Sequence, residues 1–208
     1  GFGDTGSYTG VTNLVSNTGV VASDVSAVGT ARQATAGASY GEDKGIFSFG
    51  STSVTNLVSN VGVVASDVTQ VGSARSFLGA CEYGGDKAIY GFGSGAYRSD
   101  LTNLVSNTGV VASDQAATTG TGRQGPAACT YDGDKGIFSF TVAGTMTNLV
   151  SNTGVVATDV SNTGVTARSI PGACEYGKDK GVIGYGGWSP RTTAVTNLVS
   201  NTGVVGAE

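Results

Sequence analysis

Four acid–base pairs recur along the chain and are the first residues whose types and spacing could do chemistry. Each pair is an Asp followed directly by a Lys, and the Asp residues are Asp43, Asp86, Asp134 and Asp179. A neighbouring carboxylate and amine could transfer protons, but the chain contains no His, the most frequent general base. Because the pair recurs at every predicted hairpin turn, we expect these residues to belong to a scaffold and the chain not to be an enzyme.

A second repeated set combines opposite charges. An Arg recurs after Ala or Gly, and an Asp recurs after Val-Val-Ala; they are Arg32, Arg75, Arg123 and Arg168, and Asp24, Asp67, Asp114 and Asp159. Opposite charges at fixed positions of a repeat predict structural pairing between strands or blades. The alternative is a ring of arginines that binds an anion in a central channel.

The candidates for metal or redox chemistry are weak. Cys81, Cys129 and Cys174 occupy one repeat position, where the first repeat has Ala38, so we expect them to pack rather than react. Unpaired thiols fit synthesis in a reducing cytoplasm. The Asp132-Gly133-Asp134 segment could hold calcium, but the other turns do not repeat its two Asp residues, which favours a simple turn. We therefore expect no metal and no cofactor.

Composition excludes further classes. Charged residues make up 12% of the 208 residues and the net charge is −4, which argues against a partner rich in phosphate such as nucleic acid. No apolar run approaches the roughly 18 residues that a membrane span needs, so membrane insertion is not expected. The first residues have no basic or apolar region typical of a signal peptide.

Internal repeats predict the architecture that positions these residues. Thr-Asn-Leu-Val-Ser-Asn occurs five times, and the repeated Arg and the repeated Asp-Lys both recur at spacings of 43, 48 and 45 residues. One unit with insertions at a fixed place explains both series. We divide a single domain, residues 1–208, into a half unit at 1–31 and units at 32–74, 75–122, 123–167 and 168–208.

Each unit is predicted to form four short antiparallel strands joined by Gly-containing turns, which is the size of a propeller blade. Alternation puts Tyr90 and Phe92 on one face of a strand and Ile89 and Gly91 on the other. A sheet that is apolar on both faces must be covered by neighbouring copies, large face on small face. We expect an all-β β-propeller, a closed ring of four or five four-stranded blades.

The hairpin predicted at Thr12 to Asp24 has no Arg-led partner in its unit. Such an extra N-terminal hairpin could lie over a blade edge, close the ring by strand exchange or form half of a fifth blade. The mismatched termini would also favour self-association.

The repeated segments resemble known proteins. An Arg that starts an inner strand and an Ile-aromatic strand that ends in Gly, as in residues 44–50, are similar to kelch-type propellers. The Gly-Thr-Ala-Arg, Tyr-Gly-x-Asp-Lys-x-Ile and Thr-Asn-Leu-Val-Ser-Asn-Thr-Gly-Val-Val segments resemble kelch-like repeats in predicted virion or tail-fibre proteins of aquatic bacteriophages. Most units lack the kelch Gly-Gly doublet, and the outer-strand Trp is absent. The resemblance implies a place in a virion or outside the cell.

Two connections vary between the repeats and are predicted to emerge on one face. They contain aromatic, Arg and amide side chains, which suit a sugar ring or a protein surface. These candidate ligand-binding residues are Tyr8, Tyr97, Arg98, Trp188 and Arg191 in one connection, and Gln33, Phe77, Gln124 and Ile170 in the other. The expected function is a non-catalytic module that binds a host-surface glycan or protein. The alternatives are drift in exposed loops and a structural propeller of a fibre or capsid without a ligand.

Overall fold

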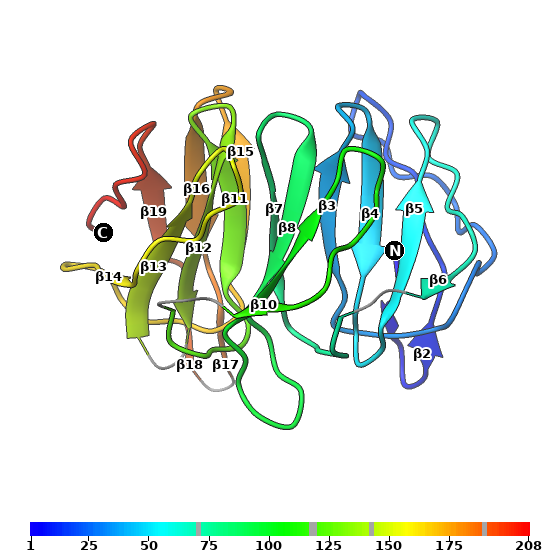
Figure 1. Cartoon of the computed structure of the whole chain (residues 1–208), viewed down its shortest axis with the longest axis horizontal. Coiled ribbons are helices and arrows are strands. Elements are labelled where there is room, and N and C mark those ends of the chain that lie inside the picture. The colour runs from blue at the N-terminus through cyan, green and yellow to red at the C-terminus, as the bar shows by residue number, and fades with distance from the viewer. Residues whose placement is uncertain (70–71, 117–119, 142–143, 189–190) are drawn as a thin grey trace.

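The computed structural model describes residues 1–69, 72–116, 120–141, 144–188 and 191–208, and all regular structure within them is β (Figure 1). Four antiparallel blades follow one another along the chain and share the arrangement of a β-propeller. Within these ranges no helix is long and apolar enough to cross a membrane. The predicted fold class is confirmed.

Three blades have four strands, and the fourth has three strands followed by a bridge between Val199 and Val205. The strands are β3 (Ala36–Tyr40), β4 (Lys44–Ser48), β5 (Val54–Val58) and β6 (Val68–Thr69) in the first blade; β7 (Gly79–Tyr83), β8 (Lys87–Gly91), β9 (Leu101–Val105) and β10 (Gln115–Ala116) in the second; β11 (Ala127–Tyr131), β12 (Lys135–Thr141), β13 (Gly144–Val150) and β14 (Val160–Ser161) in the third; and β15 (Gly172–Tyr176), β16 (Lys180–Gly184) and β19 (Thr196–Val199) in the fourth.

The register is the same in each blade. The first two strands pair as a hairpin, for example from Ala36 with Ser48 to Tyr40 with Lys44, and the third strand pairs with the second. We call the first two strands the inner hairpin, and the Thr-Asn-Leu hairpin that follows the outer hairpin. Gly62, in the outer turn of the first blade, has φ of +80°, a conformation that Gly adopts without a steric penalty.

Aromatic rings fill the spaces between the blades. Tyr90 packs edge-to-face on Phe49 of the preceding blade, with ring centroids 5.3 Å apart, and Phe92 packs in the same way on Phe138 of the following blade at 5.2 Å. Phe138 lies over Gly91, where a Cβ atom would come within 2.6 Å of the ring. Large side chains of one blade therefore nest on small residues of its neighbour, as predicted.

The prediction that Tyr90 and Phe92 share one face is wrong. Phe92 has φ of +63°, and Phe49, Phe140 and Tyr185 at the same repeat position also have positive φ. A left-handed residue interrupts strand alternation, so the ring at this position turns toward the following blade. We call the side of a blade that carries this ring its forward face.

The N-terminal hairpin is half of a further blade. Phe2 occupies the position of Phe49 and Phe92: its ring packs on Phe47 of the first blade at 5.5 Å, and its amide donates to the carbonyl of Val11. Residues 2–31, which we call the half-blade, also contain the short strands β1 (Gly3–Asp4) and β2 (Tyr8–Thr9) and the outer hairpin, held by bridges from Thr12 to Val25 and from Val15 to Val21. Of the three arrangements considered, the half of a fifth blade is the one present.

The blades pack in sequence, β3 on β7, β7 on β11 and β11 on β15, and Figure 1 shows these strands in a row. At one seam the described residues do not show the expected closure, because none of them forms a blade against the forward face of the fourth blade. Tyr185 there is 65% exposed, whereas Phe49, Phe92 and Phe140 are fully buried. Within the described part of the chain, the ring is open between the fourth blade and the half-blade.

Candidate functional site

The four repeated arginines are buried, each with at most 3% of its surface exposed. Arg75 shows the arrangement: its Nε donates to the carbonyl of Phe92 at 3.1 Å, Nη2 donates to Asn103 Oδ1 at 2.5 Å, and Nη1 pairs with Asp114 at 3.1 Å. Its guanidinium lies 4.8 Å from the centroid of the Phe49 ring in the preceding blade. Each arginine thus joins the two halves of its own blade and contacts the blade before it.

The other arginines all keep the Nη2 bond to an Asn, but Nε of Arg123 and Arg168 has no hydrogen-bond partner among the described residues. Arg123 pairs with Asp159 at 3.4 Å, and in the fourth blade Glu208 takes the place of the Asp and lies 3.6 Å from Arg168. Burial lowers the pKa of Arg123 to about 10, and the charge of Asp159 opposes the shift, so the group stays protonated at neutral pH. Guanidinium groups enclosed in this way are not the accessible ring that an anion channel needs.

The Asp-Lys pairs lie in the turns between the strands of the inner hairpins, where the first pair is exposed and the other three are half-buried. Asp43 binds Lys44 at 2.9 Å and accepts from Asn60 at 3.0 Å, and these bonds lower the pKa of Asp43. The third blade differs, because Lys135 pairs with Asp132 at 2.6 Å rather than with Asp134. Both Asp residues of the candidate calcium segment therefore have protein partners, since Asn152 donates to Asp134 at 3.1 Å.

The variable connection after the second strand of each blade lies at one end of the molecule. Figure 1 shows β2, β17 (Gly187–Trp188) and β18 (Arg191–Thr192) along its lower edge, together with the green loop between β8 and β9. Tyr8 is 53% exposed and Tyr97 is 86% exposed. Gln33 donates to the Tyr8 hydroxyl at 3.4 Å, which brings two predicted residues together. The side chains of residues 188 and 191 lie outside the described part, so the candidates Trp188 and Arg191 are placed by backbone only.

The second variable connection combines two repeat positions. Gln33 and Gln124 directly follow the repeated Arg, whereas Phe77 and Ile170 come one residue later. The later position has positive φ in all four blades and forms a ladder between them: the amide of Phe77 donates to the carbonyl of Ala34, Gly125 to Phe77, and Ile170 to Gly125. The backbones of Phe77 and Ile170 therefore hold the blades together, whatever their side chains contact.

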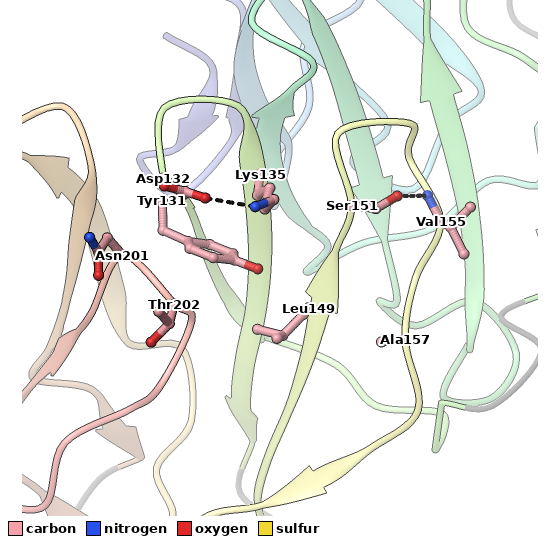
Figure 2. Close-up of a pocket in the computed structure, with 9 residues that line it drawn as sticks. All are labelled: Tyr131, Asp132, Lys135, Leu149, Ser151, Val155, Ala157, Asn201 and Thr202. Atoms are coloured by element: carbon pink, nitrogen blue, oxygen red, sulfur yellow. Dashed lines mark hydrogen bonds and ion pairs between the residues drawn. The ribbon is translucent and has the colours of Figure 1, made fainter.

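A repeated cleft at the other end was not predicted. Between the third and fourth blades it encloses about 500 Å³ and has an apolar floor with a polar rim (Figure 2). Its lining includes Tyr131, Asp132 and Lys135 of an inner hairpin, Leu149 and Val155 of an outer hairpin, and Asn201 and Thr202 of the next outer turn.

A sequence signal for this cleft exists. Val20, Val63, Val110, Val155 and Val204 occupy one position of the five outer hairpins, and each is about 65% exposed. A sequence pattern in which the same strand position is Val in every repeat predicts a buried core residue. Only the structure shows that this position faces solvent.

The thiols differ in surroundings. Cys81 and Cys129 are buried and Cys174 is exposed. Burial raises the pKa of Cys129 to about 12, so this thiol stays protonated. Among the residues that the structure describes, no group of three or more Cys, Asp or Glu side chains could hold a metal ion.

No protein-family model matches the chain, and no curated protein matches it. Among solved structures it is similar to virginiamycin B lyase from Staphylococcus aureus, with a TM-score of 0.61 and 7% sequence identity. The match covers 95% of this chain and 62% of the lyase chain, so this chain spans less than two thirds of that protein. At this identity the likeness shows the β-propeller fold and no shared activity. The kelch-like and virion interpretations rest on the sequence resemblance alone.

Proposed function

We propose that this propeller is a non-catalytic binding module that recognises a host-surface glycan or protein through the variable loops at the lower edge of Figure 1. The observation that carries the proposal is the contrast between fixed and variable parts. The backbone ladder bonds the blades to one another, and the repeated arginines lie over rings of the preceding blade. Exposed Tyr8 and Tyr97, in contrast, lie in connections that change from repeat to repeat. Variable loops on a rigid scaffold are a common arrangement for recognition.

Tyr97 is the strongest candidate anchor in this surface. An exposed aromatic ring can stack on a sugar or fill a pocket of a partner, and it loses little conformational freedom when it does so. The resemblance to predicted virion and tail-fibre proteins supports a bacterial host surface as the source of the ligand.

The test is a glycan array followed by a binding assay with whole bacterial cells. We expect saturable binding by the unaltered chain and at least tenfold weaker binding by Tyr97→Ala, in line with the loss of an interface anchor. Val110→Ser is the matched control, because Val110 is 65% exposed at the opposite end of a blade. Absence of binding to every glycan and every cell type, or equal loss in both variants, contradicts the proposal.

A structural role without a ligand is the second candidate, and one observation favours it. The forward face of the fourth blade exposes Tyr176, Tyr185 and Leu198, whose counterparts in other blades are covered by the next blade. If this face joins chains into a fibre or a capsid layer, light scattering will show a mass that rises with concentration. Tyr185→Asp will then reduce association without affecting ligand binding at the loops.

A further inference from the structure

The half-blade keeps most of the binding groups that hold an arginine in every complete blade. In the first blade Asn56 donates to the carbonyl of Ala65 at 3.0 Å and to Asp67 at 2.9 Å, which leaves its Oδ1 to accept from Arg32 at 2.6 Å. In the half-blade Asn13 donates to the carbonyl of Ala22 at 3.1 Å and to Asp24 at 2.8 Å. The amide therefore has the same orientation, with its oxygen directed to the place of the arginine.

The arginine itself is missing from the half-blade. Asn56, Asn103 and Asn148 are completely buried, whereas Asn13 and Asp24 are exposed, and no described cation contacts them. The Phe2 carbonyl corresponds to the Phe49 carbonyl, which accepts from Arg32 Nε at 2.8 Å. The Asn13 oxygen, the Asp24 carboxylate and the Phe2 carbonyl together form what we call the arginine socket.

Exposed apolar groups and a free strand edge adjoin the socket. Val15 is 65% exposed, while its counterparts Val105 and Val150 are completely buried. In complete blades this outer strand pairs with the inner hairpin, for example Asn56 opposite Phe47. Residues 12–15 of the half-blade pair only with residues 21–25 within the described chain, so their other edge can accept a strand.

The cleft beside the half-blade also lacks the residues that an inner hairpin supplies. The cleft between the half-blade and the first blade is lined by Leu14, Ser16, Val20 and Ala22, the counterparts of Leu149, Ser151, Val155 and Ala157 in Figure 2. The places of Tyr131, Asp132 and Lys135, which an inner hairpin supplies to the other cleft, have no counterpart in its lining.

We propose that the half-blade is a binding site for a β-hairpin whose first strand begins with Thr-x-Arg and which is not one of the four hairpins already held in the complete blades. The arginine enters the socket, the hairpin adds to the free edge at residues 12–15, and its apolar residues cover Val15. The Thr is included because Thr30 donates through its amide and hydroxyl to Asp67, at 2.9 and 2.6 Å, and Asp24 offers the same carboxylate. The residues of the socket, Phe2, Asn13 and Asp24, are not among those of the proposed loop surface.

A second copy of the chain is a poor donor for this hairpin. The chain has four Arg-led hairpins and five Thr-Asn-Leu hairpins, so a copy that gives one away empties a socket of its own. That exchange would also break a buried guanidinium network to form an equivalent one. A net gain therefore requires a hairpin that is not already part of a complete blade.

The probe is a labelled peptide with the sequence of residues 30–50, which contains Arg32 in its native hairpin and no Cys. Fluorescence anisotropy should show saturable binding to the unaltered chain. Asp24→Asn in the protein and Arg32→Gln in the peptide should each weaken binding at least tenfold, because each removes one side of a charge-assisted contact. Asp4→Asn is the control for net charge, since Asp4 lies in the half-blade outside the socket.

Three results would overturn the proposal. They are absence of binding, binding that survives both socket substitutions, and self-association of the chain alone that Asp24→Asn abolishes, since the last would assign the socket to a second copy. None of these results bears on glycan binding through Tyr97, and self-association sensitive to Tyr185→Asp alone would leave the socket unaffected.

Discussion

The second and fourth blades carry nearly the same residues on their forward faces but lie in different surroundings. Cys81, Tyr83 and Phe92 of the second blade are 5%, 4% and 0% exposed, because the third blade covers them. In the fourth blade Cys174 is exposed, Tyr176 is 40% exposed and Tyr185 is 65% exposed. Burial in this molecule is therefore a property of the neighbouring blade and not of the repeat sequence.

The comparison extends to polar groups. In the first three blades the Asn is buried and the Asp half-buried beside an arginine, whereas both are exposed in the half-blade. In repeat proteins each unit contacts only its neighbours, so stability is close to a sum of unit and interface contributions. Substitutions at matched positions of inner and terminal units should then differ by the contribution of one interface.

The largest difference is expected in thiol reactivity. In native protein a thiol reagent should modify Cys174 rapidly, whereas Cys81 and Cys129 should react only when the blades separate. An unfolding free energy of at least about 5 kcal/mol makes them roughly 1,000-fold slower or more. Mass spectrometry of the labelled chain, with Cys174→Ala as control, measures this. Equal labelling of all three thiols would show that the internal faces are open.

A comparable test of packing uses two aromatic residues at one repeat position. Phe92→Ala should lower the unfolding free energy by about 3–5 kcal/mol, because it leaves a cavity between blades and removes the ring under Arg123. Tyr185→Ala should change it by less than about 0.5 kcal/mol, since the ring is mostly exposed. Urea unfolding followed by circular dichroism gives both values. Similar losses would mean that a partner covers the fourth blade.

These contrasts mark the limit of sequence reasoning on the fold. The repeat spacing and the apolar strands were enough to predict four-stranded blades, large-on-small nesting and the half unit. They were not enough to place Phe92 on the forward face, because a single left-handed residue reverses alternation without a signal in the residue type. The unequal number of hairpins pointed to a seam at the termini, but the pattern did not show which faces the seam leaves exposed, since near-identical repeats look buried throughout.

The candidate sites were predictable to a similar degree. The variable loops could be located by comparing repeats, and Tyr8 and Gln33 do meet. The arginine socket could not be found in this way, because Asn13 and Asp24 have the same sequence context as their buried counterparts. The sequence does show that this hairpin lacks an Arg-led partner, but only the structure shows that the Asn13 amide keeps the orientation that receives an arginine in the complete blades.

A smaller difference in stability is expected between glycines in the outer turns of an inner blade and of the half-blade. Gly154 and Gly19 have φ of +82° and +79°, so replacement by Ala strains both by about 1 kcal/mol. At Gly154 a Cβ atom would also meet Leu104 at 2.8 Å and Tyr83 at 3.0 Å, whereas nothing lies within 4 Å at Gly19. We expect Gly154→Ala to cost about 2–3 kcal/mol in thermal unfolding and Gly19→Ala about 1 kcal/mol. A larger loss at Gly19 would show that the half-blade turn is covered.

The smallest effect is expected for the pH dependence of stability that a single carboxylate contributes where an arginine is bound beside it. Burial alone would raise the pKa of Asp114, but hydrogen bonds from Ser73 and Asn103 and the charge of Arg75 hold the pKa below its ordinary value of 3.8. A carboxylate with a lowered pKa stabilises the folded state above its ordinary pKa, and that contribution is lost as the pH falls through the folded pKa.

The unaltered chain should therefore lose stability as the pH falls below about 4. Asp114→Asn should be less stable at pH 7 and should lose less on acidification, because the group that takes up the proton is gone. Urea unfolding at pH 7, 5 and 3 measures both slopes. Asp24→Asn is the matched variant in the arginine socket of the half-blade, where no described arginine contacts the carboxylate. If the slope changes equally in the two variants, the pH dependence does not arise from arginine binding, and the distinction between filled and empty sockets loses its electrostatic basis.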